Sequence, residues 1–501
     1  MIAGILVLVV AVVSVIYYVK LRRWMTFAKD LPTVQPCYPL FGNALLFLGT
    51  SDEQRFDSIT AAMSNPAKLF KLWLGAVPLI CTNDPEMAQK ILTHPQCMEK
   101  PYFYDLFKMQ FGLFAAHYNV WKGQRKALNP SFNQKILNEF VPIFDRCARN
   151  LVGKLSQNPE NEPVQVTHFM KLCTLEMVCG TTIGCDINKD PGAFKLAHLV
   201  TTILEYISRR FLNVFLHAEF IYQLQKDYKD EEAMRNEAYK YADKIFQDTL
   251  NRRTKQSGSI TSSNQDDYRK PQIFIDQMLN LHDEKVLSDI EVIQNVYTMI
   301  AAGSDTSGME MGLITQMLAM YPHLQEKVYA EIKEVFPVSS ELNFSPENLR
   351  HLRYTEMFIK ECLRLFPIGP IIVRKTMSDI ELDGIKVPTG TVFAISIFNL
   401  HRRKDIWGPE AAEFDPENLA PERSEGRHPF AYLPFSGGNR NCIGNRYAIM
   451  SMKIMMVHLL INFQFESHFR LEDLRFKYDA LLKLSKEPGI LVKRRQKYFA
   501  K

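Results

Sequence analysis

The segment FSGGNRNCIG at residues 435–444 is the most informative stretch of this chain. It surrounds Cys442 with glycine, asparagine and arginine, residue types that build turns rather than a core. Gly438 and Gly444 permit backbone bends that bring amide groups close to the sulfur. An apolar helix is predicted directly afterwards, at Asn445–Phe463, and its positive end favours an anion. These surroundings predict a lowered thiol pKa and a thiolate that can bind a metal. The alternative for a lone cysteine is a small buried hydrophobe.

The composition excludes several classes of protein. The 501 residues are 47% hydrophobic and 23% charged, which is typical of a globular chain and not of a disordered, collagen-like or many-span membrane protein. The net charge of +5 is too weak to indicate nucleic-acid binding. Nine cysteines are scattered without a C-x-x-C pair. A disulfide framework or structural zinc site is therefore not expected, and a reducing compartment is favoured.

The amino terminus differs from the rest of the chain. Ile2–Val19 carries no charge, and a helix of that length would span about 27 Å, enough for a bilayer core. Lys20, Arg22 and Arg23 follow, which favours keeping the rest of the chain in the cytosol. We predict an uncleaved transmembrane anchor at 1–24, with a cleaved signal peptide as the alternative. The proline-rich stretch 25–45 predicts a stiff hinge, with an irregular loop as the alternative.

The remainder, 46–501, is predicted to be one mainly α-helical body with a small β-sheet region. A hairpin is expected at 69–74 and 78–82, and a polar loop at 252–270. Apolar periodicity predicts the following helices: 135–155, 164–180, 193–215, 230–253, 273–281, 288–321, 322–336 and 346–366. Short strands are predicted at 371–375, 380–382 and 392–397.

The ten-residue loop resembles the haem-ligand loop of the cytochrome P-450 family, F-x-x-G-x-R-x-C-x-G, at every specified position. In that family the cysteine thiolate binds the haem iron and favours O–O cleavage. The resemblance implies the cytochrome P-450 fold, with haem b (iron protoporphyrin IX) between the long central helix and the cysteine-loop helix. It implies that Cys442 is the axial iron ligand and that the protein is a monooxygenase.

A second motif lies inside the predicted helix 288–321. Asp305 and Thr306 interrupt a stripe of apolar residues, where unpaired polar groups are costly. One interpretation is that Thr306 returns a hydrogen bond to its own helix and bends it. The resemblance implies a catalytic pair, in which Thr306 assists oxygen activation and Asp305 relays protons from solvent.

Glu361 and Arg364 resemble the family's structural E-x-x-R pair. Apolar neighbours predict that these charges are at least partly buried, although an i,i+3 pair is usually a solvated surface pair. Asn418 stands where the family often has an arginine as third partner. An amide hydrogen bond is therefore expected to replace the usual charged triad.

Four residues resemble the family's clamp for the haem propionates: Trp121, Arg125, Arg374 and Arg440. The four-residue spacing of Trp121 and Arg125 places both on one helical face, and arginine suits bidentate contacts with carboxylates. Taken singly, each of these arginines also fits an ordinary surface charge.

The resemblance implies an apolar substrate cavity, with core packing as the alternative for its aromatic residues. The expected lining residues are Phe103, Phe107, Phe111, Phe114, Ala302 and Ile371. In the residues around these motifs, the chain is most similar to the fatty-acid ω-hydroxylase clan (family 4-like), in its insect-type branch. Some members esterify a glutamate to haem where this chain has Ala302, so non-covalent haem is expected. Fatty acids, hormone- or pheromone-like lipids and xenobiotics remain open as substrates.

No flavin or nicotinamide motif occurs, so the resemblance implies an NADPH-cytochrome reductase as electron donor, with cytochrome b5 as a second candidate. Lys122, Lys126, Arg446 and Lys453 could meet an acidic partner, or could simply be solvated. The expected location is the endoplasmic reticulum (microsomal) membrane with the catalytic domain in the cytosol, and no nucleic-acid partner is expected. Two alternatives stay open: a haem-thiolate isomerase or dehydratase, and a non-catalytic lipophile- or haem-binding protein.

Overall fold

We examined a computed structural model of the chain. The structure describes residues 26–39, 41–47, 51–74, 77–187, 191–257, 273–337, 342–479 and 481–495, with Val15, Val19, Arg22 and Trp24 before them. The predicted anchor thus lies almost entirely outside the described residues. Within the described ranges, no helix is long and apolar enough to cross a membrane.

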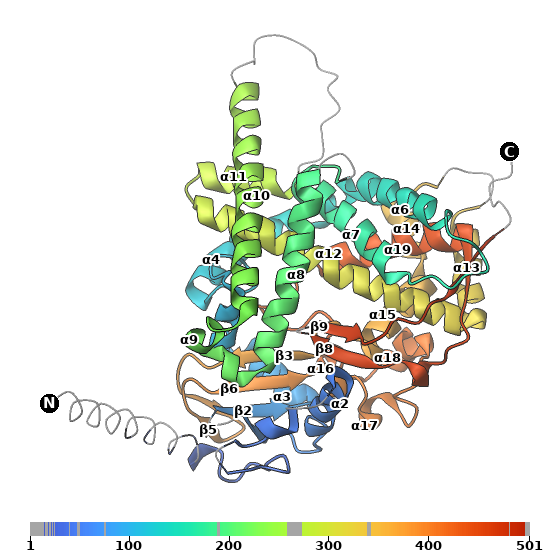
Figure 1. The fold of residues 1–501 in the computed structure, drawn as a ribbon. Coiled ribbons are helices and arrows are strands. Elements are labelled where there is room, and N and C mark those ends of the chain that lie inside the picture. Colours follow the sequence, from blue (N-terminus) through green and yellow to red (C-terminus); the bar gives the residue numbers. More distant parts are fainter. Residues whose placement is uncertain are drawn as a thin grey trace. The chain divides into compact units, whose positions relative to one another are not determined.

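The chain forms two compact units. The first comprises 1–102, 369–411 and 426–441, and the second comprises 103–368, 412–425 and 442–501. The architecture is mainly helical with small sheets, as predicted (Figure 1). The predicted boundaries of anchor, hinge and catalytic body stay predictions.

The first unit is built on a four-stranded sheet. Its order is β1 (Phe70–Leu74), β2 (Val77–Thr82), β6 (Val392–Ser396) and β3 (Ile371–Lys375). β1 and β2 form the predicted hairpin, β2 runs parallel to β6, and β3 is antiparallel to β6. The parallel pair joins segments more than 300 residues apart, which no local pattern indicates.

Helices and a hairpin complete this unit. They are α2 (Asp52–Ala62), α3 (Pro85–Thr93), α16 (Ile397–Leu400), α17 (Lys404–Trp407) and the β4–β5 hairpin (Ile380–Leu382, Ile385–Val387). Asp84 caps α3 by accepting a hydrogen bond from the backbone N–H of Met87 at 3.0 Å. Ile80, Ile91 and Phe393 are part of the apolar core that joins α3 to the sheet.

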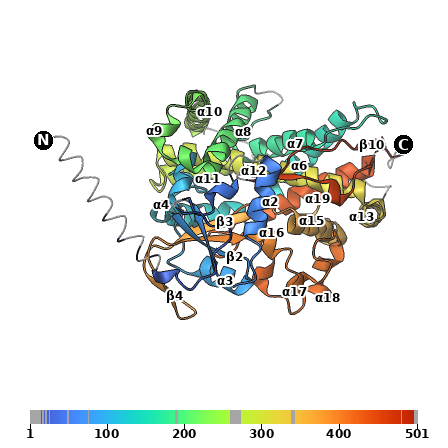
Figure 2. The ribbon, with the colours of Figure 1, turned by 60° about the horizontal axis from the view of Figure 1, so that its bottom comes forward.

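The second unit is mostly helical. Its helices are α4 (Tyr118–Leu128), α5 (Gln134–Glu139), α6 (Val141–Leu155), α7 (Thr167–Thr182), α8 (Pro191–Leu212), α9 (Glu219–Tyr222), α10 (Lys226–Ser257), α11 (Phe274–Asp283), α12 (Asp289–Met320), α13 (Pro322–Val335), α14 (Pro346–His351), α15 (Arg353–Leu365), α18 (Pro421–Ser424) and α19 (Asn445–Asn462). Two small antiparallel pairs accompany them: β7 (Phe463–Glu466) with β10 (Leu491–Arg494), and β8 (Phe476–Asp479) with β9 (Leu481–Leu484). α8 and α10 lie side by side in both ribbon views (Figures 1 and 2).

Three predicted element boundaries were wrong. The helix predicted at 135–155 divides into α5 and α6, because Pro142 in the first turn of α6 cannot continue a helix from α5. The helix predicted at 346–366 divides into α14 and α15 at Leu352, whose ψ of 69° is not helical. The loop predicted from residue 252 begins later, since α10 extends to Ser257; the rest of that loop lies outside the described residues.

The long helix α12 confirms the prediction for 288–321 and forms the centre of the second unit. Ser288 begins it with a capping box, in which the Ser288 N–H donates to Glu291 Oε2 at 2.9 Å. From Val292 to Ala319 every residue is buried except Ala302, Gly303 and Thr306. The accessible part of α12 is therefore confined to the turn that carries the Asp305–Thr306 motif.

Candidate active site

Cys442 lies three residues before α19, as the sequence predicted. Gly438 needs to be glycine, because its φ is +67° and a Cβ atom there would lie 1.9 Å from the carbonyl oxygen of Leu92. Gly444 has an ordinary φ of −91° and open space around its Cα. Its contribution is a backbone hydrogen bond to the Cys442 sulfur.

The expectation of a lowered thiol pKa is wrong for the protein chain alone. Burial raises the pKa of Cys442, and the Gly444 N–H and the nearby charge of Arg125 only partly oppose it. The side chain nevertheless keeps an accessible surface. A thiolate at this position needs a further positive charge, which a metal ion bonded to the sulfur supplies. The accessible sulfur can bind the haem iron, and the N–H of Gly444 and the guanidinium of Arg125 stabilise the thiolate. The residues around Cys442 therefore fit a haem-iron ligand.

Arg125 and Trp121 lie on one face of α4, as their spacing predicted. Trp121 is buried and Arg125 is half-buried. Burial lowers the pKa of Arg125, and the charge of Cys442 opposes that shift. The structure thus brings Arg125 and Cys442 into electrostatic contact within the second unit.

Arg374 and Arg440 come together in the first unit, where both are buried. Arg374 Nη2 donates to the carbonyl oxygen of Arg440 at 3.4 Å and to Ser436 Oγ at 3.3 Å. Arg440 Nη1 donates to the carbonyl oxygen of Met98 at 2.8 Å. These hydrogen bonds fix the positions of the two guanidinium groups in the first unit.

Lys100, a third basic residue beside this cluster, was not predicted from the sequence. Burial lowers the pKa of Lys100 well below its usual value, and the charges of Arg374 and Arg440 lower it further, while Glu99 opposes them. An isolated β-bridge between Glu99 and Lys375 brings this segment to β3. No local motif signals that contact. Two buried arginines with a lysine beside them fit a group with two carboxylates, such as haem with its propionates.

Asp305 and Thr306 are neighbours in α12, but their side chains contact different groups. Thr306 Oγ1 donates to the carbonyl oxygen of Ala302 at 2.6 Å, which confirms the hydrogen bond to its own helix. Asp305 is buried, and its Oδ1 lies 2.6 Å from Lys171 Nζ on α7. The ammonium group of Lys171 is partly exposed, so this ion pair connects the buried carboxylate to the surface of the second unit.

Glycines allow α12 to approach α7 closely. A Cβ atom on Gly303, Gly308 or Gly312 would lie within 3 Å of atoms of Val178, Lys171 or Thr167, respectively. Thr174 Oγ1 of α7 also donates to the carbonyl oxygen of Ser304 at 2.8 Å. These contacts position Asp305 against Lys171 and leave the face with Ala302 and Thr306 accessible.

Glu361 and Arg364 are completely buried and form a bidentate ion pair, with both N···O distances at 2.7 Å. Asn418 Nδ2 donates to Glu361 Oε1 at 3.0 Å, which confirms the expected amide replacement. The backbone N–H of Asp415 donates to the same oxygen at 3.0 Å, and Arg364 Nη2 also donates to the carbonyl oxygen of Glu413 at 2.9 Å. The network therefore joins α15 to the 412–425 segment.

The aromatic segment before α4 divides into two environments. Phe103 and Phe107 are buried, whereas Phe111 and Phe114 are exposed. Phe107 packs edge-on against Phe114, with their ring centroids 5.1 Å apart. Core packing therefore explains Phe103 and Phe107 at least in part, and the lining role of all four stays a prediction.

Side chains from α10 and α12 hold the backbone of this segment. The N–H of Phe111 donates to Gln294 Oε1 at 2.8 Å, and the N–H of Leu113 donates to Asn295 Oδ1 at 3.0 Å. Arg235 Nη1 donates to the carbonyl oxygen of Phe107 at 2.8 Å. The sequence analysis missed Gln294, Asn295 and Arg235; their polarity inside helical stripes was the available signal.

Ile371, another expected lining residue, is half-buried in β3 of the first unit. Its lining role stays a prediction.

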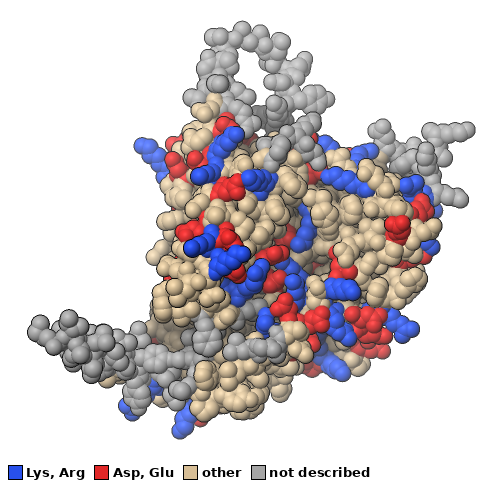
Figure 3. All heavy atoms as spheres, viewed as in Figure 1, with Lys and Arg blue, Asp and Glu red and all other residues tan. Residues whose placement is uncertain are grey.

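The prediction that Lys453 meets an electron donor is wrong. Its side chain is buried, and Nζ donates to the carbonyl oxygen of Leu349 at 2.8 Å and lies 2.6 Å from Glu356. Lys122, Lys126 and Arg446 are exposed and stay candidates. Figure 3 shows that charges of both signs are interspersed over the face it draws, as the small net charge suggests.

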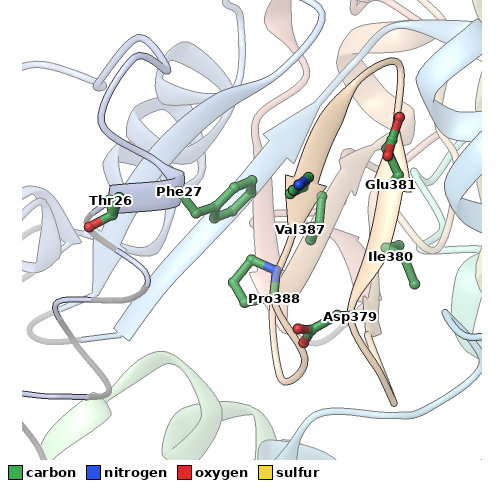
Figure 4. A pocket seen from close by; sticks show the side chains of 8 residues that line it. Thr26, Phe27, Asp379, Ile380, Glu381, Val387 and Pro388 are labelled. Carbon is green, nitrogen blue, oxygen red and sulfur yellow. The ribbon is translucent and has the colours of Figure 1, made fainter.

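A surface groove of about 610 Å³ lies in the first unit, between Phe27 and the β4–β5 hairpin (Figure 4). Asp379, Ile380, Val387 and Pro388 contribute to its lining. None of the candidate site residues lines it. The groove is therefore not a candidate for the active site.

Comparisons with known proteins identify the family of the chain. A sequence model of the family described as Cytochrome P450 matches residues 32–492. "Cytochrome P450 4c21" from Blattella germanica is 30% identical over 95% of both chains. "Probable cytochrome P450 313a2" from Drosophila melanogaster is 31% identical over 91% of this chain and 92% of its own length. "Cytochrome P450 4V2" from Rattus norvegicus is 30% identical over 95% of this chain and 91% of its own length.

The fold and the cysteine site define a haem-thiolate enzyme, and the chain belongs to the cytochrome P450 family. The protein is a P450 monooxygenase that binds haem b non-covalently through a cysteine thiolate. The resemblance to family 4 and to insect members of the family is confirmed.

Proposed function

We propose that this enzyme is membrane-bound and inserts one oxygen atom of O₂ into a small lipophilic substrate, with electrons from an NADPH-cytochrome reductase. Cys442 is the haem-iron ligand, and the observation that carries this assignment is its accessible sulfur beside the Gly444 N–H and Arg125. Bound haem supplies the redox chemistry that activates dioxygen. The protein supplies binding, orientation and protons.

Trp121, Arg125, Arg374 and Arg440 are proposed to bind the haem propionates, as the family resemblance implies. Lys100 is added to this set because it lies close enough to Arg374 and Arg440 for their charges to lower its pKa. Arginine pairs with carboxylates bidentately, so these residues set the orientation of the ring as well as its affinity.

Thr306 and Asp305 are proposed to act in oxygen activation. Thr306 lies in the accessible turn of α12 and presents its hydroxyl there, while Asp305 pairs with the partly exposed Lys171 and is proposed to relay protons from solvent. An acid next to a hydroxyl argues against a haem-thiolate isomerase or dehydratase, which needs no proton delivery to dioxygen. A non-catalytic binder would need none of these groups.

The proposed substrates are fatty acids, hormone- or pheromone-like lipids and xenobiotics. Exposed rings at Phe111 and Phe114 support an apolar ligand. Ala302 has no carboxylate that could form an ester with haem. A screen of substrate-induced spectral shifts over these three classes identifies the ligand, and binding of polar metabolites only would contradict the proposal.

The proposed location is the microsomal membrane, with the catalytic body in the cytosol. The uncharged Ile2–Val19 segment and the three cations after it support this orientation. Lys122, Lys126 and Arg446 are proposed to meet an acidic face of the reductase or of cytochrome b5. Lys122→Glu should raise the reductase concentration needed for half-maximal rate, and the increase should shrink at high salt.

The central assignment is tested with the carbon monoxide difference spectrum of the reduced protein. Cys442→Ala should abolish the band of a thiolate-ligated ferrous carbonyl. Cys362→Ala is the matched control, because Cys362 is completely buried and burial raises its thiol pKa well above the ordinary value. Retention of the band in Cys442→Ala would overturn the assignment. Acidic extraction with organic solvent should release all haem, as expected for non-covalent binding.

A further inference from the structure

Glu310 is a buried acid in α12 to which the family resemblance assigns no role. Its exposed fraction is 1%. Neither carboxyl oxygen has a hydrogen-bond partner within the described part of the chain. Burial raises its pKa well above the ordinary value and so favours the protonated form.

Glu310 shares a helical face with Thr306. It follows Thr306 by four residues and Ala302 by eight, so all three side chains lie along one side of α12. Ala302 and Thr306 are the accessible positions on this side. Cβ atoms four residues apart on a helix are separated by about 5–6 Å, a distance that the length of a glutamate side chain covers.

Asp305, the acid expected from the sequence, lies on another face. Gly308 and Gly312 pack against α7, and Asp305 pairs with Lys171, which also belongs to α7. Glu310 comes two residues after Gly308 and two before Gly312, which turns it about 200° away from either. Of these two acids, Asp305 therefore lies beside a lysine, and Glu310 lies on the Thr306 side of α12.

The groups around Glu310 offer no compensating charge. Burial is the only cause of its raised pKa. On α15 the thiol of Cys362 is close enough for the charge of Glu310 to raise its pKa. Glu361 and Arg364 of α15 are paired with each other, and Lys171 of α7 is paired with Asp305. None of these groups forms a hydrogen bond or an ion pair with Glu310.

A buried carboxyl group such as that of Glu310 lowers the free energy of unfolding. A buried polar group without a partner costs about 1–3 kcal/mol, and an apolar residue of similar size would remove that cost. Unsatisfied buried groups and strongly shifted pKa values are concentrated at functional sites. Among the described residues Glu310 has no partner that it could hold in place, so a structural role does not explain it.

We propose that Glu310 stores a proton for the Thr306 hydroxyl during dioxygen reduction, an inference that rests on the proposed oxygen chemistry at Thr306. In this step the O–H bond of the Glu310 carboxyl breaks, and its proton moves to the Thr306 hydroxyl as that hydroxyl gives its own proton to the dioxygen being reduced. Glu310 is left as a carboxylate and takes its next proton from solvent. No electron is transferred. Glu310 acts only through Thr306 and does not touch the reacting oxygen atoms. It is therefore a positioning residue and not a catalytic residue.

The test compares Glu310→Gln, Glu310→Asp and Glu310→Met in the haem-loaded enzyme. All three variants should give the band of a thiolate-ligated ferrous carbonyl. If the wild type also lacked this band, the proposed function would be contradicted, whereas the inference about Glu310 would not be. The infrared spectrum of the wild type should contain the C=O stretch of a protonated, buried carboxylic acid that Glu310→Gln lacks. Glu310→Met should unfold at a higher denaturant concentration than the wild type.

The second measurement is the coupling of NADPH consumption to product formation, which falls when hydrogen peroxide is released instead. Glu310→Gln should release several-fold more hydrogen peroxide per NADPH consumed, with a changed pH profile, and Glu310→Asp should restore much of the coupling. Glu176→Gln is the matched control, because Glu176 is equally buried but has partners in Asn150 and Lys154. It should lower stability and leave coupling unchanged. Wild-type coupling and pH profile in Glu310→Gln, or absence of the infrared band, would overturn the proposal.

Discussion

Replacing Gly308 with alanine should loosen the contact between α7 and α12. The new Cβ atom would lie 2.7 Å from Lys171 Cα, 2.8 Å from Lys171 Cγ and 2.8 Å from Thr174 Oγ1. The Cα atom belongs to the backbone, so no side-chain rotation relieves the clash. One helix must therefore move.

The magnitude follows from three contributions. Alanine in a helix interior is favoured over glycine by about 1 kcal/mol. Overpacking costs about 1–3 kcal/mol, and separating the helices also weakens the hydrogen bond from Thr174 to the carbonyl oxygen of Ser304, worth about 1 kcal/mol. The balance is a loss of about 1–3 kcal/mol in the free energy of unfolding.

Denaturant unfolding of the haem-loaded protein measures this loss. Gly153→Ala is the matched control, because Gly153 is an exposed helical glycine with nothing within 4 Å of its added Cβ atom. It should gain up to about 1 kcal/mol. The movement should also weaken the Lys171–Asp305 ion pair and increase peroxide release. If Gly308→Ala were as stable as Gly153→Ala, the close approach of α7 and α12 would be refuted.

Two further outcomes concern buried charges. Arg364→Met should cost about 3–5 kcal/mol, because it leaves Glu361 buried without its cation. Asn418→Leu should cost only about 1.5–3 kcal/mol, because Glu361 keeps its other donors; equal losses in denaturant unfolding would contradict this ranking. Burial favours a higher pKa for Asp145, but hydrogen bonds from His458 and Arg149 outweigh it and lower that pKa. The stability that Asp145 contributes is therefore present above the unfolded-state pKa and is lost as the pH falls through the folded-state pKa. Asp145→Asn should flatten the acid limb of the stability profile, and an unchanged limb would refute the assignment.

The local chemistry of α12 and α19 made their prediction straightforward. Ser288 and Glu291 form a capping box at one end of α12, and Pro322 follows the other. The hairpin at 69–82 was predictable for a similar reason, since its strands are neighbours in sequence. Breaks such as Leu352 were not, because its non-helical ψ interrupts an otherwise continuous apolar pattern.

The candidate site was predictable where a motif is continuous and unpredictable where burial decides. Cys442 was identified from its own flanking residues, and Asn418 as a partner of Glu361 from its position in a family motif. Lys453 looked like a surface cation until α19 placed it beside Glu356. Lys100 had no distinguishing neighbours, and only a β-bridge to a segment far along the chain gives it a place in the basic cluster.

By itself, the sequence determined the family, the thiolate loop, the central helix and the uncharged amino-terminal segment, because each depends on residues within a few positions of one another. The tertiary structure decided which charges are compensated. It paired Asp305 with Lys171, left Glu310 without a hydrogen-bond partner among the described residues and raised the pKa of Cys442. These differences arise from desolvation and from contacts between distant segments, and neither is encoded in a local pattern.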